Sequence, residues 1–189
     1  MLFDDKLSDI IRTLENGGVL LHPTDTVWGL ASSVFSKEAI EKIYSMKKRD
    51  RSQPLLLLVD SLEMLKKYVP HIHPRIETLL HFHHKPLTVI YPNVDLIPKF
   101  ARANDNSVAI RIIRDPYCNQ IIGLLGSPLI STSANIGGEP FPKTFSEVNQ
   151  NLIDEADFVS MHMRLERVMA RPSVLINYDQ DGEINFLRL

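Results

Sequence analysis

The spacing of apolar residues along the chain predicts short helices intermixed with short strands. Apolar positions from Leu7 to Leu14 recur at helical spacing, and the glycine pair at 17–18 supplies a stop. Ser36 is a good N-cap for a second helix. Further helices are expected after Ser61, after Pro74, at 116–125 and after Thr144. Strands are expected at 19–21, 55–59, 87–91, 107–113, 128–133, 173–177 and 183–189.

Two local patterns define the last third of the chain. Thr144 and Glu147 have the spacing of a capping box, which predicts that one more helix opens there. Residues 173–177 and 183–189 flank the turn sequence DQDG, and this pattern predicts a β-hairpin. Because strands and helices do not alternate strictly, we expect helices packed on a mixed sheet rather than a purely parallel one. The length of 189 residues, without repeat or linker, favours a single domain spanning residues 1–189.

Composition narrows the classes of partner and compartment. The formal net charge is −2, so no overall basic field attracts nucleic acid, and any RNA contact must use local patches. The single cysteine, Cys118, fits a reducing compartment, and its apolar, helix-like surroundings indicate a buried structural thiol. The N-terminus lacks a signal-peptide pattern and no apolar run reaches the length of a membrane span. We therefore expect a cytoplasmic protein without a membrane segment.

The first two of four polar clusters follow an early strand and an early helix. In HPTDTVWGL, Thr24, Asp25 and Thr26 either form a turn or build a polar rim where a strand ends at a ligand site. In KKRDR, Lys47 and Arg49 either belong to a solvated helix end, which favours cations, or grip the phosphates of a nucleotide.

The other two polar clusters lie in later strands. Arg111 alternates with apolar residues in the strand SVAIR, where it needs an anionic partner from either an internal salt bridge or a ligand. The stretch STSAN at 131–135, followed by two glycines, either presents several donors to an anion or is ordinary loop sequence. The chain has neither a G-x-x-x-x-G-K-[ST] loop nor a G-x-G-x-x-G motif, so a nucleotide site would be of another kind.

The stretch HIHPRIETLLHFHH contains five of the seven histidines. On a helix that starts near Pro74, Glu77, His81 and His84 would share one face, opposite a buried stripe that includes Ile76. Three ligands on one helix close a tetrahedral zinc site poorly. We interpret them as a solvated face and predict no metal site.

Taken in order, the clusters resemble the YrdC-like family, the threonylcarbamoyl-AMP synthases. HPTDTVWGL resembles the family's proline-threonine-acid-threonine loop, and KKR followed by QPL resembles its Lys-x-Arg segment. KPLTVIYP, SVAIRIIRDP and STSANIGGEP resemble its Pro-Leu-Thr strand, its Val-Arg strand and its Ser-Ala-Asn loop. ARPSVLIN and FLRL resemble its last two segments. The order and approximate spacing agree over nearly the whole chain.

The resemblance implies an α+β, three-layer YrdC-like fold, in which helices pack on both faces of a twisted mixed sheet. It implies synthesis of L-threonylcarbamoyladenylate and pyrophosphate from L-threonine, bicarbonate or CO₂, and ATP, with Mg²⁺ on the phosphates. A separate tRNA threonylcarbamoyl transferase complex would use this product to modify adenosine 37 of tRNA. The threonine carbamate would attack the α-phosphate, a displacement that needs positioning and charge neutralisation more than acid–base chemistry.

The family pattern also assigns residues to the two substrates. The positions that match its threonine site are Thr26, Arg111, Ser131 and Ser173. The positions that match its ATP site or lie beside it are Lys47, Arg49, Gln53, Ser107, Ser133, Asn135 and Arg188. No nucleophile is assigned, and Lys47 and Arg49 would act by positioning and charge stabilisation.

The chain departs from the family pattern at a few positions. Trp28 replaces a tyrosine or phenylalanine, Leu58 a frequent histidine, Phe141 a small polar residue and Val174 a threonine. These changes leave open a diverged paralogue that forms another carbamoyl-adenylate. A non-catalytic module that binds double-stranded RNA or tRNA is the alternative from another class, and a weak RNA contact stays open. The slightly negative net charge argues against the RNA-binding module.

Overall fold

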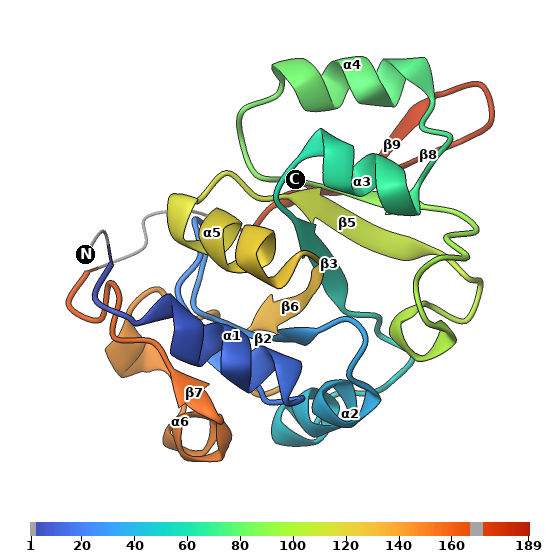
Figure 1. Cartoon of the computed structure of the whole chain (residues 1–189). Coiled ribbons are helices and arrows are strands. Elements are labelled where there is room, and N and C mark those ends of the chain that lie inside the picture. Colours follow the sequence, from blue (N-terminus) through green and yellow to red (C-terminus); the bar gives the residue numbers. More distant parts are fainter. Residues whose placement is uncertain (1–2, 167–171) are drawn as a thin grey trace.

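The computed structural model describes residues 3–166 and 172–189, and a nine-stranded mixed sheet forms its centre (Figure 1). The strands are β1 (Leu20–His22), β2 (Gly29–Ser33), β3 (Leu56–Val59), β4 (Leu87–Tyr91), β5 (Val108–Ile112), β6 (Leu129–Ser133), β7 (Phe158–Val159), β8 (Val174–Tyr178) and β9 (Ile184–Arg188). They follow the order β7-β1-β2-β6-β3-β5-β4-β8-β9. At the centre, β3 runs parallel to β5 and antiparallel to β6.

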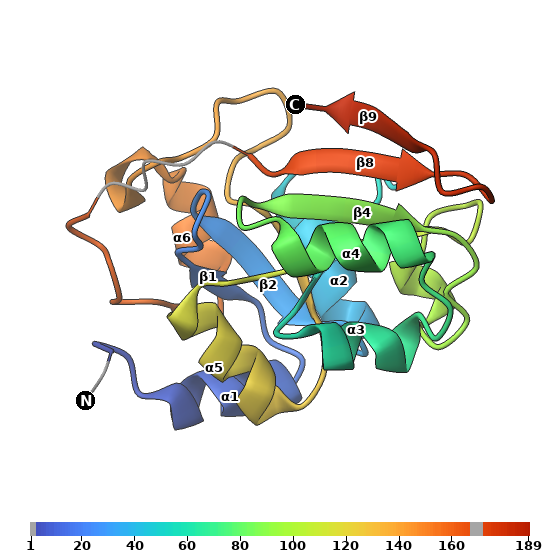
Figure 2. The ribbon, with the colours of Figure 1, turned by 90° about the horizontal axis from the view of Figure 1, so that it is seen from above.

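Side-chain caps mark the start of five of the six described α-helices, all except α1. The α-helices are α1 (Leu7–Glu15), α2 (Lys37–Met46), α3 (Leu62–Tyr68), α4 (Pro74–Phe82), α5 (Pro116–Leu125) and α6 (Gln150–Glu155), and the 3₁₀ turns are η1 (Lys99–Ala101) and η2 (Phe145–Glu147). The Ser36 hydroxyl accepts a bond from the Ala39 N–H at 3.2 Å, and this confirms the predicted cap of α2. In both views α1 lies beside α5, and α3 lies beside α4 (Figure 2).

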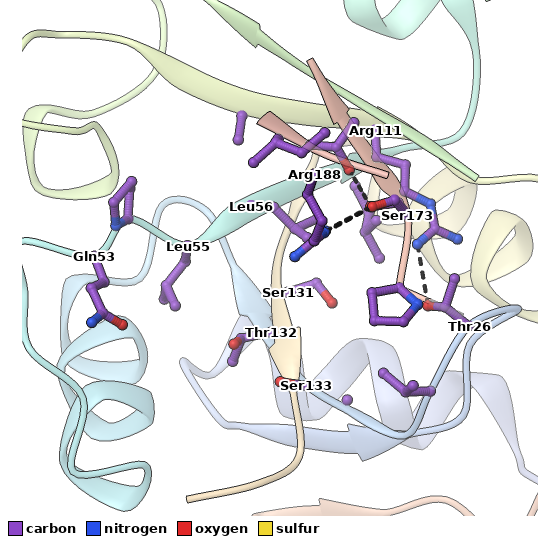
Figure 3. Close-up of a pocket in the computed structure, with 18 of the residues that line it drawn as sticks. Thr26, Gln53, Leu55, Leu56, Arg111, Ser131, Thr132, Ser133, Ser173 and Arg188 are labelled. Atoms are coloured by element: carbon purple, nitrogen blue, oxygen red, sulfur yellow. Dashed lines mark hydrogen bonds between the residues drawn. The ribbon is translucent and has the colours of Figure 1, made fainter. Parts of the chain in front are cut away.

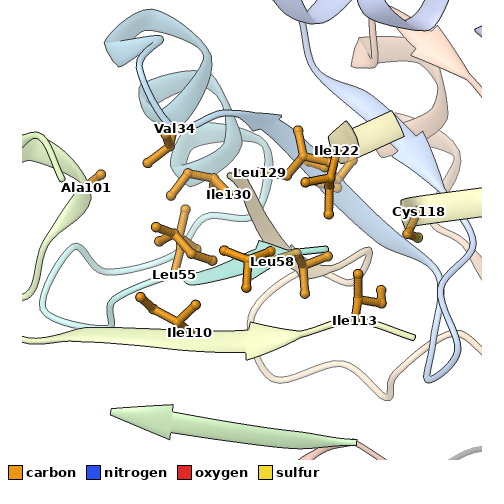
Figure 4. Packing of buried hydrophobic residues seen from close by; sticks show 14 of the residues in the cluster. Val34, Leu55, Leu58, Ala101, Ile110, Ile113, Cys118, Ile122, Leu129 and Ile130 are labelled. Atoms are coloured by element: carbon orange, nitrogen blue, oxygen red, sulfur yellow. The ribbon is translucent and has the colours of Figure 1, made fainter. Parts of the chain in front are cut away.

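Strand alternation gives the sheet two different faces. Ile110 and Ile130 point to the face that α2 covers, together with Leu55 (Figure 4). On the opposite face Leu129 packs near Ile122 of α5. Helices therefore cover both faces, and the predicted α+β architecture with a twisted mixed sheet is confirmed.

The second face is apolar only where α5 covers it. Leu58 pairs with Arg111 on this face, and Ser131 lies on the neighbouring strand. The alternation expected for residues 107–111 is thus confirmed, since Arg111 and Ile110 point to opposite faces. The polar part of this face is where a ligand could reach the sheet.

Two expectations about local structure were wrong. The Thr144 side chain makes no cap, and η2 is a single 3₁₀ turn; the following helix begins instead after Asn149, whose side chain accepts the Asn151 N–H. One Glu147 carboxylate oxygen accepts the N–H of Lys143, and without a cap from the Thr144 side chain the reciprocal capping box does not close. Strand β2 was also missed, because its small residues GLASS carry little of the β-branched signal that marks strands.

Two other expectations are confirmed. The C-terminal strands β8 and β9 form an antiparallel hairpin. Cys118 is completely buried in α5, and burial raises the pKa of its thiol well above the usual value. Within the described ranges no helix is both long and apolar enough to span a membrane.

Candidate active site

The polar part of the sheet's second face forms the floor of a cavity of about 530 Å³ (Figure 3). Its walls come from the loop after β1, from the segment that leads into β3, and from the C-terminal hairpin. Among the described residues that line it, Arg49, Arg111 and Arg188 carry positive charge and none carries negative charge. The cavity is therefore suited to ligands with several anionic groups.

The loop between β1 and β2 is both a turn and a wall of the cavity. The Thr24 hydroxyl accepts the N–H groups of Thr26 and Val27 at 3.1 and 3.2 Å and donates to the Val27 carbonyl at 2.8 Å. The Thr24 and Thr26 hydroxyls also lie 2.9 Å apart, within hydrogen-bond distance of each other. Thr26 nevertheless lines the cavity, so this turn also forms part of the cavity wall.

Gly29 lets two strands approach closely at the end of this loop. A Cβ atom at this position would lie 3.1 Å from the Thr132 carbonyl oxygen and 3.7 Å from the Ser131 hydroxyl. Trp28, just before it, is fully buried, and its ring packs against Phe145 at a centroid distance of 5.1 Å. The tryptophan supports the loop from behind.

Arg111 is the most deeply buried charge of the cavity, since its side chain is only 4% exposed. One terminal nitrogen donates to the Thr26 hydroxyl at 3.2 Å, and the other donates to the Asp25 carboxylate. The Nε atom is buried and has no hydrogen-bond partner in the part of the chain that the structure describes. Arg111 thus has the internal salt bridge that its strand position suggested, and Nε–H and the second N–H of each terminal nitrogen are left for a ligand.

Ser173 and Arg188 close the cavity from the hairpin side. The Ser173 hydroxyl lies 2.7 Å from the Thr88 hydroxyl of β4. Arg188 donates from Nε and from a terminal nitrogen to the Ser173 carbonyl, at 3.0 and 2.9 Å. Burial, and then repulsion from Arg111, lower the pKa of Arg188. The two guanidinium groups therefore face the same part of the cavity, and an anion bound there would offset the repulsion between them.

Arg49 occupies the opposite wall. Its guanidinium donates to the carbonyls of Gln53 and Pro54, both at 3.1 Å, and so closes the 49–54 loop on itself. Burial lowers the pKa of Arg49. Gln53 is exposed to solvent at this edge of the cavity.

Lys47 lies beneath the cavity rather than in its wall. It is 2% exposed, and its ammonium donates to the backbone carbonyls of Ser133 and Asn135, the second at 2.6 Å. Burial, followed by the charge of Arg49, lowers the pKa of Lys47 to about 8. The lysine holds the turn after β6, and through this turn it places the Ser133 side chain in the cavity.

The structure brings together most of the residues predicted for the site. The predicted residues that line the cavity are Thr26, Arg49, Gln53, Arg111, Ser131, Ser133, Ser173 and Arg188. The predicted residues outside its lining are Lys47, Ser107 and Asn135. Ser107 precedes β5, where its N–H donates to the Asp105 carboxylate at 2.9 Å. The roles of all eleven in substrate binding remain predictions.

Several lining residues were not predicted for the site. Thr88 is 2% exposed in the otherwise apolar strand β4, and a lone polar residue there was a signal as clear as that of Arg111. Thr24 lines the cavity and belonged to the first polar cluster together with Asp25, which lies outside the lining; nothing in their pattern showed that both contact neighbouring side chains. Leu58 and Phe141, two of the departures from the family pattern, also line the cavity.

The histidine-rich stretch is remote from this site. Helix α4 ends at Phe82, so His84 lies outside the helix, and Glu77 forms an ion pair with Lys66 of α3. Over residues 3–166 and 172–189 no group of histidine, cysteine and acidic side chains could hold a metal ion. The face is a solvated surface, as expected.

Comparisons with known proteins agree with this geometry. The Sua5_yciO_yrdC family model, described as telomere recombination, matches residues 12–189. A threonylcarbamoyl-AMP synthase of Vibrio parahaemolyticus is 30% identical over 154 residues, which cover 80% of this chain and 83% of that protein.

Two solved structures share the fold. P. abyssi Sua5 complexed with L-threonine superposes with a TM-score of 0.85 at 24% identity, over 96% of this chain and 53% of that one. The chain thus spans about half the length of that Sua5. E. coli YciO superposes with a TM-score of 0.81 at 20% identity, over 96% of this chain and 87% of that one. With a family model that matches nearly its whole length, the chain belongs to the Sua5, YciO and YrdC family.

Proposed function

We propose that the protein is a threonylcarbamoyl-AMP synthase, which makes L-threonylcarbamoyladenylate and pyrophosphate from L-threonine, bicarbonate or CO₂, and ATP. One observation carries the proposal: three arginines and several hydroxyl groups, but no described acidic residue, line a single cavity. A carboxylate, a carbamate and a triphosphate all need such surroundings. The Vibrio parahaemolyticus relative bears the name of this activity.

The amino acid would bind between the loop after β1 and the hairpin. Its carboxylate would accept from the unpartnered Nε of Arg111. The Thr26 hydroxyl already lies within hydrogen-bond distance of the Thr24 hydroxyl and accepts from Arg111, and it would form a further hydrogen bond with the substrate's amino or hydroxyl group. Ser131 and Ser173 complete this half of the cavity.

The nucleotide would bind along the 49–54 loop and the end of β6. Arg49 and Arg188 would neutralise phosphate oxygens, and Ser133 and Gln53 would donate to the nucleotide. Lys47, with Asn135, would act indirectly by holding the turn that carries Ser133. Ser107 stands apart from the lining, so we assign it no direct contact.

The reaction needs two bonds to form. The substrate nitrogen bonds to the carbon of CO₂ and loses a proton, which gives a carbamate. A carbamate oxygen then bonds to the α-phosphorus while the bond from that phosphorus to the β-phosphate oxygen breaks, and pyrophosphate leaves. The arginines would hold the carbamate and the triphosphate close together and in line. Without this positive charge, the two anions would repel each other.

Mg²⁺ and the later steps involve groups outside the chain. The described lining includes no carboxylate that could ligate Mg²⁺, so the ion would arrive on the ATP phosphates, and we derive no step from it. The product would pass to a tRNA threonylcarbamoyl transferase complex in the cytoplasm. Direct RNA binding finds little support in the basic segment, because Lys47 is buried, Arg49 bonds to its own loop and Arg51 pairs with Glu41.

The test measures pyrophosphate release with ATP, L-threonine and bicarbonate together, and then with each omitted. We expect turnover only with the complete mixture, and mass spectrometry should show the threonylcarbamoyl adenylate. Equal turnover with carbamoyl phosphate in place of threonine and bicarbonate would instead indicate an enzyme that forms another carbamoyl-adenylate.

A further inference from the structure

Among the described residues, Asp25 is the acidic side chain that forms an ion pair with the guanidinium of Arg111. The two residues come from the loop after β1 and from strand β5, and they are 86 positions apart in the chain. The Arg111 side chain is 4% exposed, whereas that of Asp25 is 27% exposed. The carboxylate thus reaches a buried cation from a position that still touches water.

The contacts of Arg111 fix the orientation of its guanidinium plane. Asp25 and Thr26 are consecutive residues, and each accepts from a different terminal nitrogen of the same group. The Thr24 hydrogen bonds hold the loop that presents both acceptors. Each terminal nitrogen has one N–H engaged by this loop, and Nε has no partner among the described residues. Because the guanidinium is planar, the two contacts also set the direction of the Nε–H bond.

We propose that Asp25 is a positioning residue, which holds the Arg111 guanidinium so that its Nε atom donates to the carboxylate of the substrate. The inference rests on the proposed function, in which this half of the cavity binds L-threonine. Asp25 does not touch the substrate in this account. It acts through Arg111, much as an outer group orients a ligand-binding residue in other sites.

The opposite role for Asp25 would be a competing anion, which occupies Arg111 until substrate displaces it. The two roles predict opposite signs. If Asp25 competes, removal of its charge strengthens the binding of every anion in the cavity, threonine and ATP alike. If Asp25 positions, removal of its charge weakens threonine binding through lost geometry, while ATP binding stays equal or becomes slightly stronger.

The test compares Asp25→Asn and Asp25→Glu with the wild-type protein by calorimetric titration of L-threonine, L-threoninol and ATP. Threoninol has a hydroxymethyl group in place of the carboxylate, so it does not need the Nε donor. We expect Asp25→Asn to weaken threonine binding by about tenfold and threoninol binding by less than about twofold. Asp25→Glu keeps the charge and is expected to retain more threonine affinity than Asp25→Asn.

A matched control is available in the Arg102 and Asp95 pair, which also joins a buried arginine to an exposed aspartate, at 2.9 Å. Neither residue lines the cavity, so Asp95→Asn should leave all three titrations unchanged. Unfolding curves of each variant show whether it is folded at the temperature of the titration.

The outcomes separate the inference from the proposed function. A wild-type protein that binds no threonine contradicts the proposed function itself. If the wild type binds threonine but Asp25→Asn binds it more tightly, or loses threonine and threoninol equally, Asp25 does not position Arg111 for a carboxylate. If Asp25→Asn does not fold, Asp25→Glu decides the question alone: a selective loss for threonine over threoninol supports positioning, and equal losses refute it.

Discussion

The two halves of the cavity differ in how far they are formed before a ligand binds. In the half assigned to the amino acid, Thr26, Arg111 and Ser173 are 5%, 4% and 4% exposed, and each is hydrogen-bonded to another element. In the half assigned to the nucleotide, Gln53 is exposed and Phe141 is 45% exposed. The first half is buried and hydrogen-bonded between elements, whereas the second consists largely of exposed loop residues together with the ends of β6 and β9.

This difference suits the sizes of the two substrates. A small amino acid offers few atoms, so selectivity for it requires fixed partners with satisfied hydrogen bonds. A nucleoside triphosphate offers many charged oxygens, and it can be held by loops that adjust around it. We therefore expect mutations in the buried half to have larger and more selective effects than mutations in the loop half.

Arg111→Ala should have the largest effect. It removes the carboxylate donor and leaves Asp25 without its cation, so threonine binding should weaken by about 100-fold, with ATP affinity changed by less than about threefold. Arg111→Lys keeps the charge but lacks the planar guanidinium, so its threonine affinity should lie between that of the wild type and that of Arg111→Ala. Calorimetric titration of both ligands measures the effect. A greater loss of ATP than of threonine would mean that the two halves are assigned in reverse.

Arg49→Ala tests the loop half. A lost charge-assisted contact should weaken ATP binding by about 2 kcal/mol, which is roughly 30-fold, and leave threonine affinity unchanged. Arg51→Ala is the matched control, because Arg51 lies in the same loop but stacks on Tyr44 outside the cavity. If Arg49→Ala and Arg51→Ala weaken ATP binding equally, the loop attracts ATP only through its overall positive charge and not through a specific contact of Arg49.

Acid should destabilise the protein through His22, which lies behind the buried half. The ring is completely buried and its Nδ1 is 3.6 Å from the Cys118 sulfur. Burial lowers the pKa of His22 to about 4, although Asp115 acts in the opposite direction. Because the unfolded value is about 6.5, this contribution to stability is complete above pH 6.5 and is lost as the pH falls toward 4.

At pH 5 the loss should be about 2 kcal/mol in the free energy of unfolding relative to pH 7. Urea unfolding at the two pH values measures it, and His22→Phe should reduce the difference. NMR of the ring protons gives an independent check on the native protein. A midpoint near 6.5 would show that the ring is accessible and would contradict the burial argument.

Much of the fold could be predicted from the sequence because its strands and helices carry strong local signals. Strand β4 and helix α5 have the bounds that their apolar runs and flanking prolines indicated. Strand β2 could not be predicted in the same way, since GLASS is extended through its pairing with β1 and β6 rather than through its own preference. The failed cap at Thr144 has a similar origin, because the partner of Glu147 depends on the path of the chain around it.

The residues of the site were easier to identify than their partners. Arg111 and the hydroxyls of the STSAN stretch are conspicuous because they interrupt apolar strands. Asp25 and Thr26 contact Arg111 because the order of strands in the sheet places β5 and the loop after β1 at one cavity. Local sequence does not specify that order. Lys47 shows the same limit: its charge suggested a phosphate contact, but the fold buries it against backbone carbonyls.

The smallest expected effect tests whether the loop after β1 recognises the substrate or only forms a turn. Thr26→Val keeps the shape of the side chain and removes the hydroxyl that accepts from Arg111 and contacts the Thr24 hydroxyl. Since Asp25 still holds the other terminal nitrogen of Arg111, the guanidinium should stay close to its place. Threonine binding should then weaken by about 1 kcal/mol, or roughly fivefold, through the lost acceptor, with ATP affinity nearly unchanged. Ser52→Ala, at an exposed position of the loop half, is the control, and it should leave threonine affinity unchanged. If Thr26→Val binds threonine as tightly as the wild type, the buried half recognises the amino acid without this hydroxyl, and the loop is only a turn.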